Sequence, residues 1–175
     1  MLRKATARDA AFVRSLWTTP DNTRFIVAPE ADEIETKTAT GDLLIWTTAG
    51  QPAGFATLTQ WFPRVWTIPA VAVQDRRAGT GLAMMQAVLD VMFHVRNAHR
   101  VGLDVTADNP GALSLFRRLG FVTEGVWREC WCRPDGAWVD CVFLALLKHE
   151  WRAQPKLTPR QEPFRCRWKR AISKT

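Results

Sequence analysis

Tyrosine is absent from this 175-residue chain, and histidine and cysteine are scarce. The lack of tyrosine excludes a phenolic side chain from any acid–base chemistry that the protein performs. The chain has three histidines and four cysteines, and the cysteines form no pair of Cys-x-x-Cys motifs. Since structural zinc sites are commonly built from such pairs, we predict no metal site and interpret the cysteines as reduced, mostly structural thiols.

Long hydrophobic runs are also lacking. No uninterrupted apolar stretch approaches the ~20 residues that a membrane-spanning helix needs. Polar residues follow the first five positions, where a signal peptide would continue with an apolar segment. We therefore expect no membrane partner and a cytoplasmic location, in which disulfides rarely form.

Positive charge is concentrated at one end of the chain. Residues 1–147 carry 15 basic and 15 acidic residues, whereas residues 148–175 carry nine basic residues and two acidic ones, which accounts for the net charge of +7. The last 28 residues also contain three prolines and no sustained hydrophobic period. We predict a folded domain over residues 1–147 and a basic, irregular extension over 148–175, with a short helical turn near Trp168.

The extension raises the question of a nucleic-acid or ribosome partner. Basic residues alternate with Phe164 and Trp168, a pattern that can contact phosphates and stack on bases. No folded nucleic-acid-binding motif accompanies it, however. A solvated or self-packed tail is the favoured interpretation.

Hydrophobic periodicity over the first 147 residues predicts a mixed α/β (α+β) domain. Alternating or β-branched segments predict strands, and apolar residues at three- and four-residue spacing predict helices. The expected strands are 2–6, 43–48, 53–61, 65–73, 100–105, 121–127 and 137–147, and the expected helices are 9–17, 29–40, 81–94 and 109–119. The order β-α-α-β-β-β-α-β-α-β-β gives a central sheet of about seven strands flanked by about four helices.

A glycine-containing turn between a strand and a helix is the strongest chemical signal. It has the sequence Arg76-Arg77-Ala78-Gly79-Thr80-Gly81-Leu82. Glycines allow close approach of the backbone, and the free N–H groups of a first helical turn suit a pyrophosphate. The segment lacks the Gly-Lys-Ser/Thr of a Walker loop and the glycine spacing of a Rossmann fingerprint.

A second motif gives the first one its context. The segment Asn109-Pro110-Gly111-Ala112-Leu113-Ser114-Leu115-Phe116-Arg117-Arg118-Leu119-Gly120-Phe121 follows the strand Leu103-Asp104-Val105. Together with the Arg-x-x-Gly-x-Gly turn, it resembles the GNAT superfamily of N-acetyltransferases. The opening Leu2-Arg3-x-Ala5-x-x-x-Asp9 and the stretch Glu124–Arg128 are similar to members near the bacterial ribosomal-protein N-terminal (alanine) acetyltransferases. The resemblance covers residues 2–147.

The resemblance implies a GNAT fold with acetyl-coenzyme A bound where two strands splay apart. It implies that backbone groups of Val71 and Val73 bind the pantetheine arm and that Asn109 binds its end. The pyrophosphate would contact the turn, which comprises Arg76, Arg77, Ala78, Gly79, Thr80, Gly81 and Leu82. Asn109 is also a good helix N-cap in its own right.

Two further positions bear on the chemistry that the resemblance implies. Phe116 occupies the slot where the family often has a tyrosine that protonates the leaving thiolate, so here a water would serve. Asp104 lies twelve residues earlier, where the N-terminal-acetylating branch has a carboxylate, and is the candidate general base. The alternative is that Asp104 is an exposed strand residue; Glu124 and Asp140 are weaker candidates.

The implied function is acetyl transfer to a primary amine, either a small molecule or a peptide N-terminus. The alternatives are a coenzyme-A-binding module without catalysis and a ribosome- or RNA-associated protein. Four tryptophans are expected on or near strands that border the acceptor cleft: Trp61, Trp66, Trp131 and Trp138. They could line an aromatic acceptor pocket, but plain packing is the favoured interpretation for each of them. The sequence leaves homodimer formation and the identity of the amine open.

Overall fold

The structure, a computed structural model, describes residues 1–76, 79–133 and 135–153. Its strands and helices follow the predicted mixed order, with several segments divided further. The strands are β1 Leu2–Lys4, β2 Leu43–Thr48, β3 Gln51–Thr57, β4 Thr59–Phe62, β5 Val65–Thr67, β6 Val71–Val73, β7 Arg100–Thr106, β8 Val122–Cys132 and β9 Trp138–Leu147; the helices are η1 Ala7–Asp9, α1 Ala10–Trp17, α2 Pro20–Thr23, α3 Glu33–Thr40, α4 Thr80–Asp90, η2 Val91–Val95, α5 Pro110–Arg118 and α6 Lys148–Ala153.

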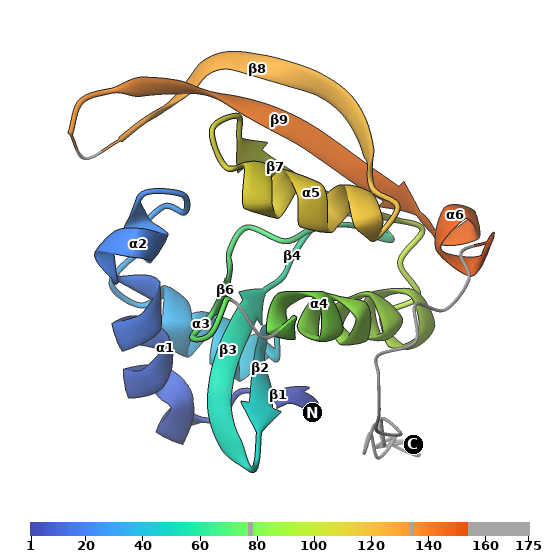
Figure 1. Cartoon of the computed structure of the whole chain (residues 1–175). Helices are drawn as coiled ribbons and strands as arrows, with labels where there is room; N and C mark the ends of the chain where they lie inside the picture. Colours follow the sequence, from blue (N-terminus) through green and yellow to red (C-terminus); the bar gives the residue numbers. More distant parts are fainter. Residues whose placement is uncertain (77–78, 134, 154–175) are drawn as a thin grey trace.

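The strands form two sheets. The first sheet has the order β1-β2-β3-β6, and the second has the order β4-β5-β7-β9-β8. All the pairings are antiparallel except that of β5 with β7, which is parallel. Figure 1 shows the long β8–β9 hairpin arching over α5, with the first sheet below it. The predicted α/β class is therefore confirmed.

The two sheets separate within what the sequence predicts as one strand, residues 65–73. Its first part, β5, pairs with β7, whereas its last part, β6, pairs with β3. Pro69 lies in the break. Because proline has no backbone N–H to donate to a neighbouring strand, the chain changes its pairing partner here. Before the proline, the N–H of Ile68 donates to Gly102 O of β7. After it, Ala70 O accepts from Thr57 N of β3. The predicted strand 53–61 divides in the same region, which is why more strands are found than the sequence predicts.

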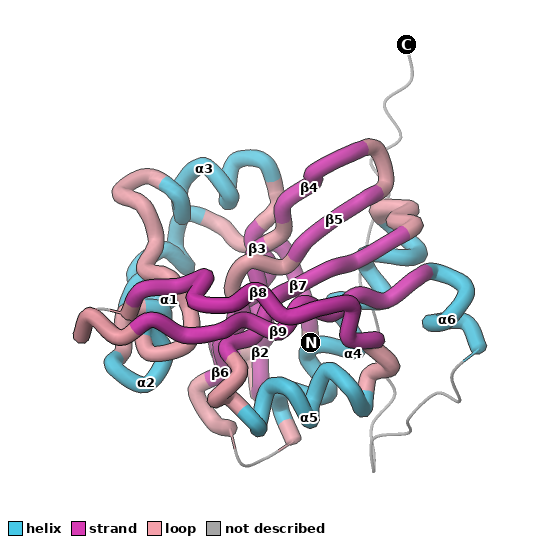
Figure 2. Tube along the Cα trace, turned by 90° about the horizontal axis from the view of Figure 1, so that it is seen from above, coloured by secondary structure: helices cyan, strands magenta, loops and turns pink. Residues whose placement is uncertain are grey.

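Helices cover the sheets from opposite sides. Helices α4 and α5 bury their apolar faces in a core that includes Leu103 and Val105 of β7. Helices α1 and α3 pack with the first sheet in a second core around Phe55 and Ile34. Among the residues that the structure describes, no helix covers the face of the second sheet opposite α4 and α5, and Figure 2 shows β4, β5 and β7 spread between α3 and α6.

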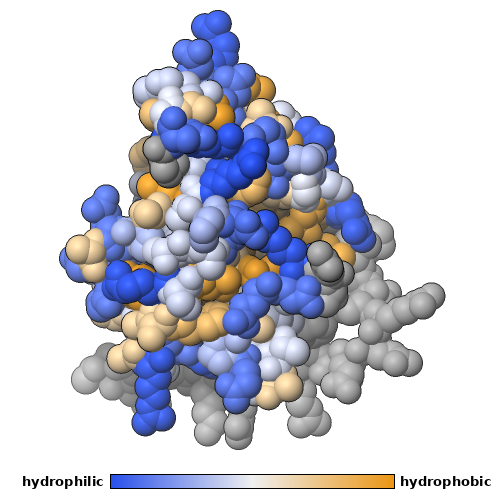
Figure 3. Space-filling view, turned by 60° about the vertical axis from the view of Figure 1, so that its left-hand side comes forward, coloured by the Kyte–Doolittle hydropathy of each residue, from blue (hydrophilic) through white to orange (hydrophobic). Residues whose placement is uncertain are grey.

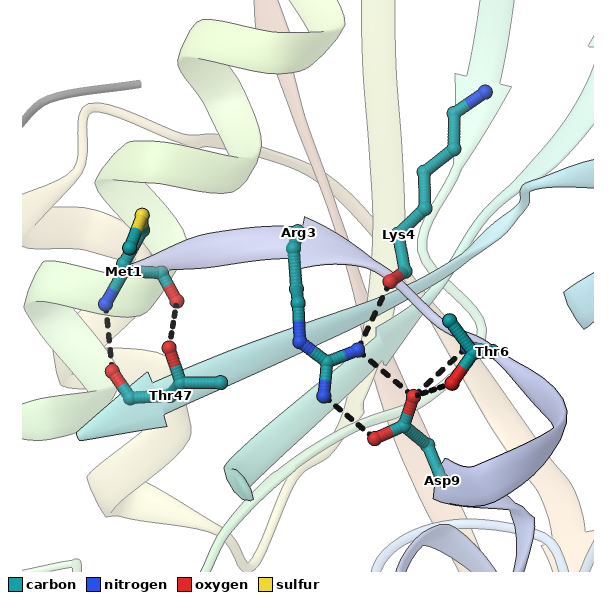
Figure 4. A network of polar contacts seen from close by, with 6 residues as sticks. All are labelled: Met1, Arg3, Lys4, Thr6, Asp9 and Thr47. Atoms are coloured by element: carbon teal, nitrogen blue, oxygen red, sulfur yellow. Dashed lines mark hydrogen bonds and ion pairs between the residues drawn. The ribbon is translucent and has the colours of Figure 1, made fainter. Parts of the chain in front are cut away.

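The N-terminal corner is held by a saturated polar network, drawn in Figure 4. Arg3 donates two hydrogen bonds to the Asp9 carboxylate, at 2.8 and 2.6 Å. The backbone N–H and the hydroxyl of Thr6 donate to the same carboxylate at 2.8 and 2.9 Å. These hydrogen bonds lie at the start of η1, which leads into α1. They provide partners for the carboxylate of Asp9, a residue that is only 4% exposed.

The structure has two short helices, α2 and α6, where the sequence predicts none. Pro20, expected only to end α1, occupies the first turn of α2, where its fixed φ suits a helix. Residues 148–153 form α6, and Trp151 stacks on Phe93 with a centroid distance of 6.1 Å, so the predicted extension begins as an ordered helix. Trp168 and the rest of the basic tail lie outside the described residues.

The cysteines also depart from the expectation. The structure joins Cys130 and Cys141 in a disulfide across β8 and β9, with Cα atoms 6.2 Å apart. The prediction of reduced thiols is thus wrong for this pair, because the register of β8 shifts between Trp127 and Trp131 and this irregular stretch brings Cys130 to Cys141 on β9. Cys132 is free and exposed. No helix within the described ranges is long and apolar enough to cross a membrane.

Candidate functional site

The free edge of β6 faces the split between the sheets. Ala70 and Gln74 bond with β3, through Ala70 O and Gln74 N. Because successive residues of a strand direct their N–H and C=O groups to opposite edges, Val71 and Val73 direct theirs away from β3. The backbone groups that the sequence assigns to the pantetheine arm thus lie on the open edge of the first sheet.

Helix α4 begins at Thr80, seven residues after the end of β6 at Val73. Gly79 is its N-cap and has φ +68°, a left-handed conformation that glycine adopts without strain. The N–H groups of Leu82 and Ala83 donate to Gly79 O, at 3.1 and 3.2 Å. The N–H of Leu82 is therefore already used, and Thr80 and Gly81 hold the first-turn N–H groups that an anion would meet.

The arginine end of the turn is partly described. The guanidinium of Arg76 donates to Asn22 Oδ1 at 2.6 Å and to Asp21 O at 3.1 Å. Arg76 thus ties the turn before α4 to helix α2, a contact that the sequence does not reveal. Arg77 and Ala78 lie outside the described residues.

The second motif begins as expected and buries its aromatic residue. Asn109 Oδ1 accepts from Ala112 N at 3.1 Å, so the N-cap role is confirmed, while its contact with a cofactor stays a prediction. Phe116 is 3% exposed and packs edge-on against Phe121, with ring centroids 5.5 Å apart. Its place beside a thioester also stays a prediction.

Asp104 lies on β7 on the face that no helix covers. Its neighbours Leu103 and Val105 point into the core with α4 and α5, so alternation places Asp104 on the opposite face. The carboxyl retains access to solvent but is crowded by the sheet, and this partial desolvation raises its pKa. Within the described chain no basic side chain pairs with it. A carboxylate with these properties is suited to accept a proton.

The other candidate acids have structural roles. Glu124 is ion-paired with Arg100, and that guanidinium lowers the pKa of its carboxyl, which makes it a weaker base. Asp140 Oδ1 accepts from the N–H of Glu129, whose φ is +48°, so Asp140 anchors the bulge of the last hairpin. His94 and His99 are exposed, as expected for a helix end and a turn. The described residues contain no cluster of three or more histidine, cysteine or acidic side chains that could hold a metal ion.

The tryptophans divide between core and surface. Trp66 is buried, with the Arg96 guanidinium 5.1 Å from its ring centroid, and so does not line an accessible site. Trp61 stacks with Phe143 at 6.2 Å, and Phe143 stacks with Trp127 at 5.0 Å. Phe143 and Trp127 are missing from the sequence prediction. The alternation of residues 141, 143 and 145 along β9 carries the signal, but only the register shows that Phe143 pairs with Asp104.

A charged cluster borders the carboxyl end of β7. Arg133 of the hairpin donates to Asp108 Oδ1 at 2.5 Å, and Arg24 lies 3.7 Å from Asp108 Oδ2. The hydrogen bond from Arg133 is the main reason that the pKa of Asp108 is lowered. The guanidinium of Arg133 also lies 5.9 Å from the Phe25 ring centroid. The hairpin is thereby joined to the segment after α2, and Figure 3 shows this side of the molecule, with hydrophobic residues recessed between hydrophilic ones.

Comparison with known proteins identifies the family. The sequence profile of the Acetyltransferase (GNAT) family matches residues 7–121. The match covers more than half of the chain and includes the split strand, the turn before α4 and the second motif. The chain belongs to the GNAT acetyltransferase family.

Individual relatives agree with this assignment. An N-alpha-acetyltransferase of Sulfurisphaera tokodaii is 37% identical over 70 residues, which cover 40% of this chain and 42% of the relative, so the match spans less than half of that protein. The crystal structure of spermidine N-acetyltransferase from Vibrio cholerae, in complex with CoA and spermine, superposes with a TM-score of 0.75 at 20% identity, over 87% of this chain and 97% of that chain. A ribosomal-protein-alanine N-acetyltransferase from Brucella melitensis gives a TM-score of 0.70 at 18% identity, over 84% and 99%. At these identities the structural likeness shows the fold.

Proposed function

We propose that this protein is an N-acetyltransferase that moves an acetyl group from acetyl-CoA to a primary amine by direct attack in a ternary complex. The observation that carries the proposal is the split between β6 and β7. It leaves the Val71 and Val73 backbone groups on an open edge and is followed by the first turn of α4. An open strand edge suits the amides of pantetheine, and a first helical turn suits its pyrophosphate. The relatives named above act on amines, which supports the same class of reaction.

The residues on β7 supply the acid–base chemistry in this proposal. The amine nitrogen attacks the thioester carbonyl carbon, a C–N bond forms and the C–S bond breaks. Asp104, directly or through a water, accepts the proton that the amine loses, and its raised pKa makes it a stronger base than an ordinary aspartate. The thiolate takes its proton from water, since the chain has no tyrosine and Phe116 has no proton to donate. Asn109, Thr80 and Gly81 position the cosubstrate.

The amine has two candidate classes, a small molecule and a peptide N-terminus. The polyamine and ribosomal-protein relatives illustrate both. Four further points stay predictions: the cytoplasmic location, a homodimer, the domain boundary at residue 147, and a ribosome or RNA contact through the tail.

A direct assay tests the proposal. The full chain is incubated with acetyl-CoA and a panel of amines, and acetylated products are identified by mass spectrometry. Calorimetry measures acetyl-CoA binding in parallel. Binding without any acetylated product would support the cofactor-binding module instead, and absence of binding would overturn both interpretations.

A further inference from the structure

Three aromatic rings form a row across the uncovered face of the second sheet. This aromatic row consists of Trp61, Phe143 and Trp127, from β4, β9 and β8, with centroid distances of 6.2 and 5.0 Å and interplanar angles of 24° and 20°. Trp61 remains 52% exposed and Trp127 53% exposed. Exposed apolar patches mark interaction surfaces, and aromatic rings bind flat groups by stacking.

The aromatic row lies beside the candidate base. Phe143 is the direct partner of Asp104 in the β7–β9 register and of Gly125 in the β8–β9 register. Side chains directly opposite each other in an antiparallel pair share a face at about 5 Å. Gly125 has nothing within 4 Å of the position that a Cβ would take, and Gly102 meets only ordinary contacts with Phe143 and Leu144. The sheet is therefore open beside Gly125, whereas the Phe143 ring itself covers Gly102, and Asp104 lies beside the same ring.

The charges around the aromatic row bear on how many ammonium groups a bound amine carries. Asp104, the register partner of Phe143, has no ion-pair partner in the described chain. Glu124 is neutralised by Arg100. Asp108 is paired with both Arg133 and Arg24, and these three residues together carry a net positive charge. A ligand with one ammonium group matches this pattern. Glu129 and Asp140 lie with Arg128 at the Trp127 end of the row, and Asp140 already accepts the Glu129 N–H, so Asp104 is the carboxylate that meets a cation at the middle ring.

We propose that the acetyl acceptor is a small primary amine with a single cationic nitrogen and an aromatic body. The ring stacks on the aromatic row, and the nitrogen lies at Asp104. This inference rests on the proposed acetyltransferase function, which it narrows to a substrate class.

A substrate panel tests the inference. 2-Phenylethylamine and tryptamine are compared with butylamine, spermidine and a peptide with an N-terminal alanine, by kcat/KM at saturating acetyl-CoA. We expect the aromatic monoamines to exceed the others by about tenfold or more, because they alone in the panel can stack on the aromatic row. A preference for spermidine or for the peptide would overturn the inference.

Variants of the aromatic row provide the second arm. Trp61→Ala and Trp127→Ala should each raise KM for 2-phenylethylamine about fivefold or more and leave butylamine unchanged, and Trp127→Phe should restore most of the effect. Phe62→Ala, at a 66% exposed aromatic residue on β4 outside the row, is the matched control. Unchanged KM ratios in folded variants would contradict the stacking role.

A binding measurement separates the two possible failures. Quenching of tryptophan fluorescence by 2-phenylethylamine reports on the aromatic row without requiring turnover. Binding that Trp127→Ala abolishes, without acetylation of any amine, would refute the transferase function and keep the ring site. Acetylation of all monoamines alike would keep the transferase function and refute the aromatic preference.

Discussion

Two aspartates in different regions of the molecule show how this chain uses carboxylates. Asp9, in the N-terminal corner, is 4% exposed and accepts hydrogen bonds from Arg3 and Thr6. The hydrogen bond from Arg3 is the largest reason that the pKa of Asp9 falls to about 2. Asp104, on the uncovered face of the second sheet, has no ion-pair partner in the described chain, and desolvation raises its pKa.

The difference separates a structural carboxylate from a reactive one. A carboxylate whose pKa is lowered by fixed donors stabilises the fold at neutral pH but accepts protons poorly. A carboxylate whose pKa is raised costs the fold free energy when it is ionised, and that cost is typical of functional sites. Each region therefore predicts an opposite response to removal of its charge.

The largest expected effect is that of Asp104→Asn on catalysis. Turnover should fall by ~10²–10⁴-fold, the usual loss for one acid–base group, while acetyl-CoA affinity by calorimetry stays unchanged. The melting temperature at pH 7 should rise, because a carboxyl with a raised pKa binds its proton more tightly when folded and destabilises the fold when ionised. That gain should vanish as the pH falls below about 3.8, where the unfolded state is protonated too.

Asp90→Asn, at an exposed carboxylate on α4, is the control for this change. It should leave turnover at the wild-type level. Turnover of Asp104→Asn within a few-fold of wild type across a pH series would assign the proton to water or to another group, and Asp104 would then be an ordinary strand residue.

The next effect concerns the cosubstrate side of the split. Gly81→Val should weaken acetyl-CoA binding by about tenfold or more, roughly 1.4 kcal/mol, because a branched side chain blocks approach to the first-turn N–H groups. A Cβ at Gly81 would meet only Leu115 Cδ2, at 3.6 Å, so the fold should persist. Calorimetry gives the affinity and circular dichroism checks the fold. Wild-type affinity in the folded variant would contradict the assignment of the turn.

A smaller effect is expected in the N-terminal corner. Asp9→Asn should lower the free energy of unfolding at pH 7 by about 1–2 kcal/mol, a value reduced because the Arg3 side chain is partly exposed. Turnover per folded molecule should not change. In the wild type this contribution is complete above pH 3.8 and is lost as the pH falls toward about 2.

The exposed pair of Arg14 and Glu35, 3.2 Å apart, is the matched control for the N-terminal corner. Glu35→Gln should cost at most about 0.5 kcal/mol in urea unfolding, because solvent screens both partners. Equal losses in the two variants would show that burial of Asp9 adds nothing.

Most of the fold is predictable from the sequence because its signals are local. Apolar spacing predicts α4 and α5, and Asn109-Pro110 predicts the start of α5, as found. The divided strands are not predictable in this way. Residues 65–73 read as one β-branched run, and only the change of pairing partner at Pro69 shows that they belong to two sheets.

The candidate site is predictable where one motif supplies it and not where distant strands meet. Asp104 is a candidate because the GNAT resemblance implies a carboxylate twelve residues before the Phe116 position. The aromatic row depends on the registers of β7 with β9 and of β9 with β8, in which Phe143 pairs with residues 39 and 18 positions away. The disulfide of Cys130 and Cys141 depends on the same pairing, and composition alone argues against it.

The smallest expected effect is that of Phe116→Tyr, which locates the cosubstrate relative to the second motif. Phe116 is 3% exposed and packs on Phe121, so a hydroxyl added there has no water to bond with in the free protein. We expect a loss of about 1 kcal/mol in the stability of the free protein. If the ring edge lies beside the thioester, bound acetyl-CoA supplies a partner, and the rise in melting temperature on adding acetyl-CoA should be larger in the variant than in the wild type. Turnover should then stay equal or increase, because the phenol can protonate the thiolate.

Phe121→Tyr places the same atom on the opposite side of the ring contact and is the control: it should lose stability without any added benefit from acetyl-CoA. Identical responses of the two variants would place Phe116 in the core alone, away from the thioester.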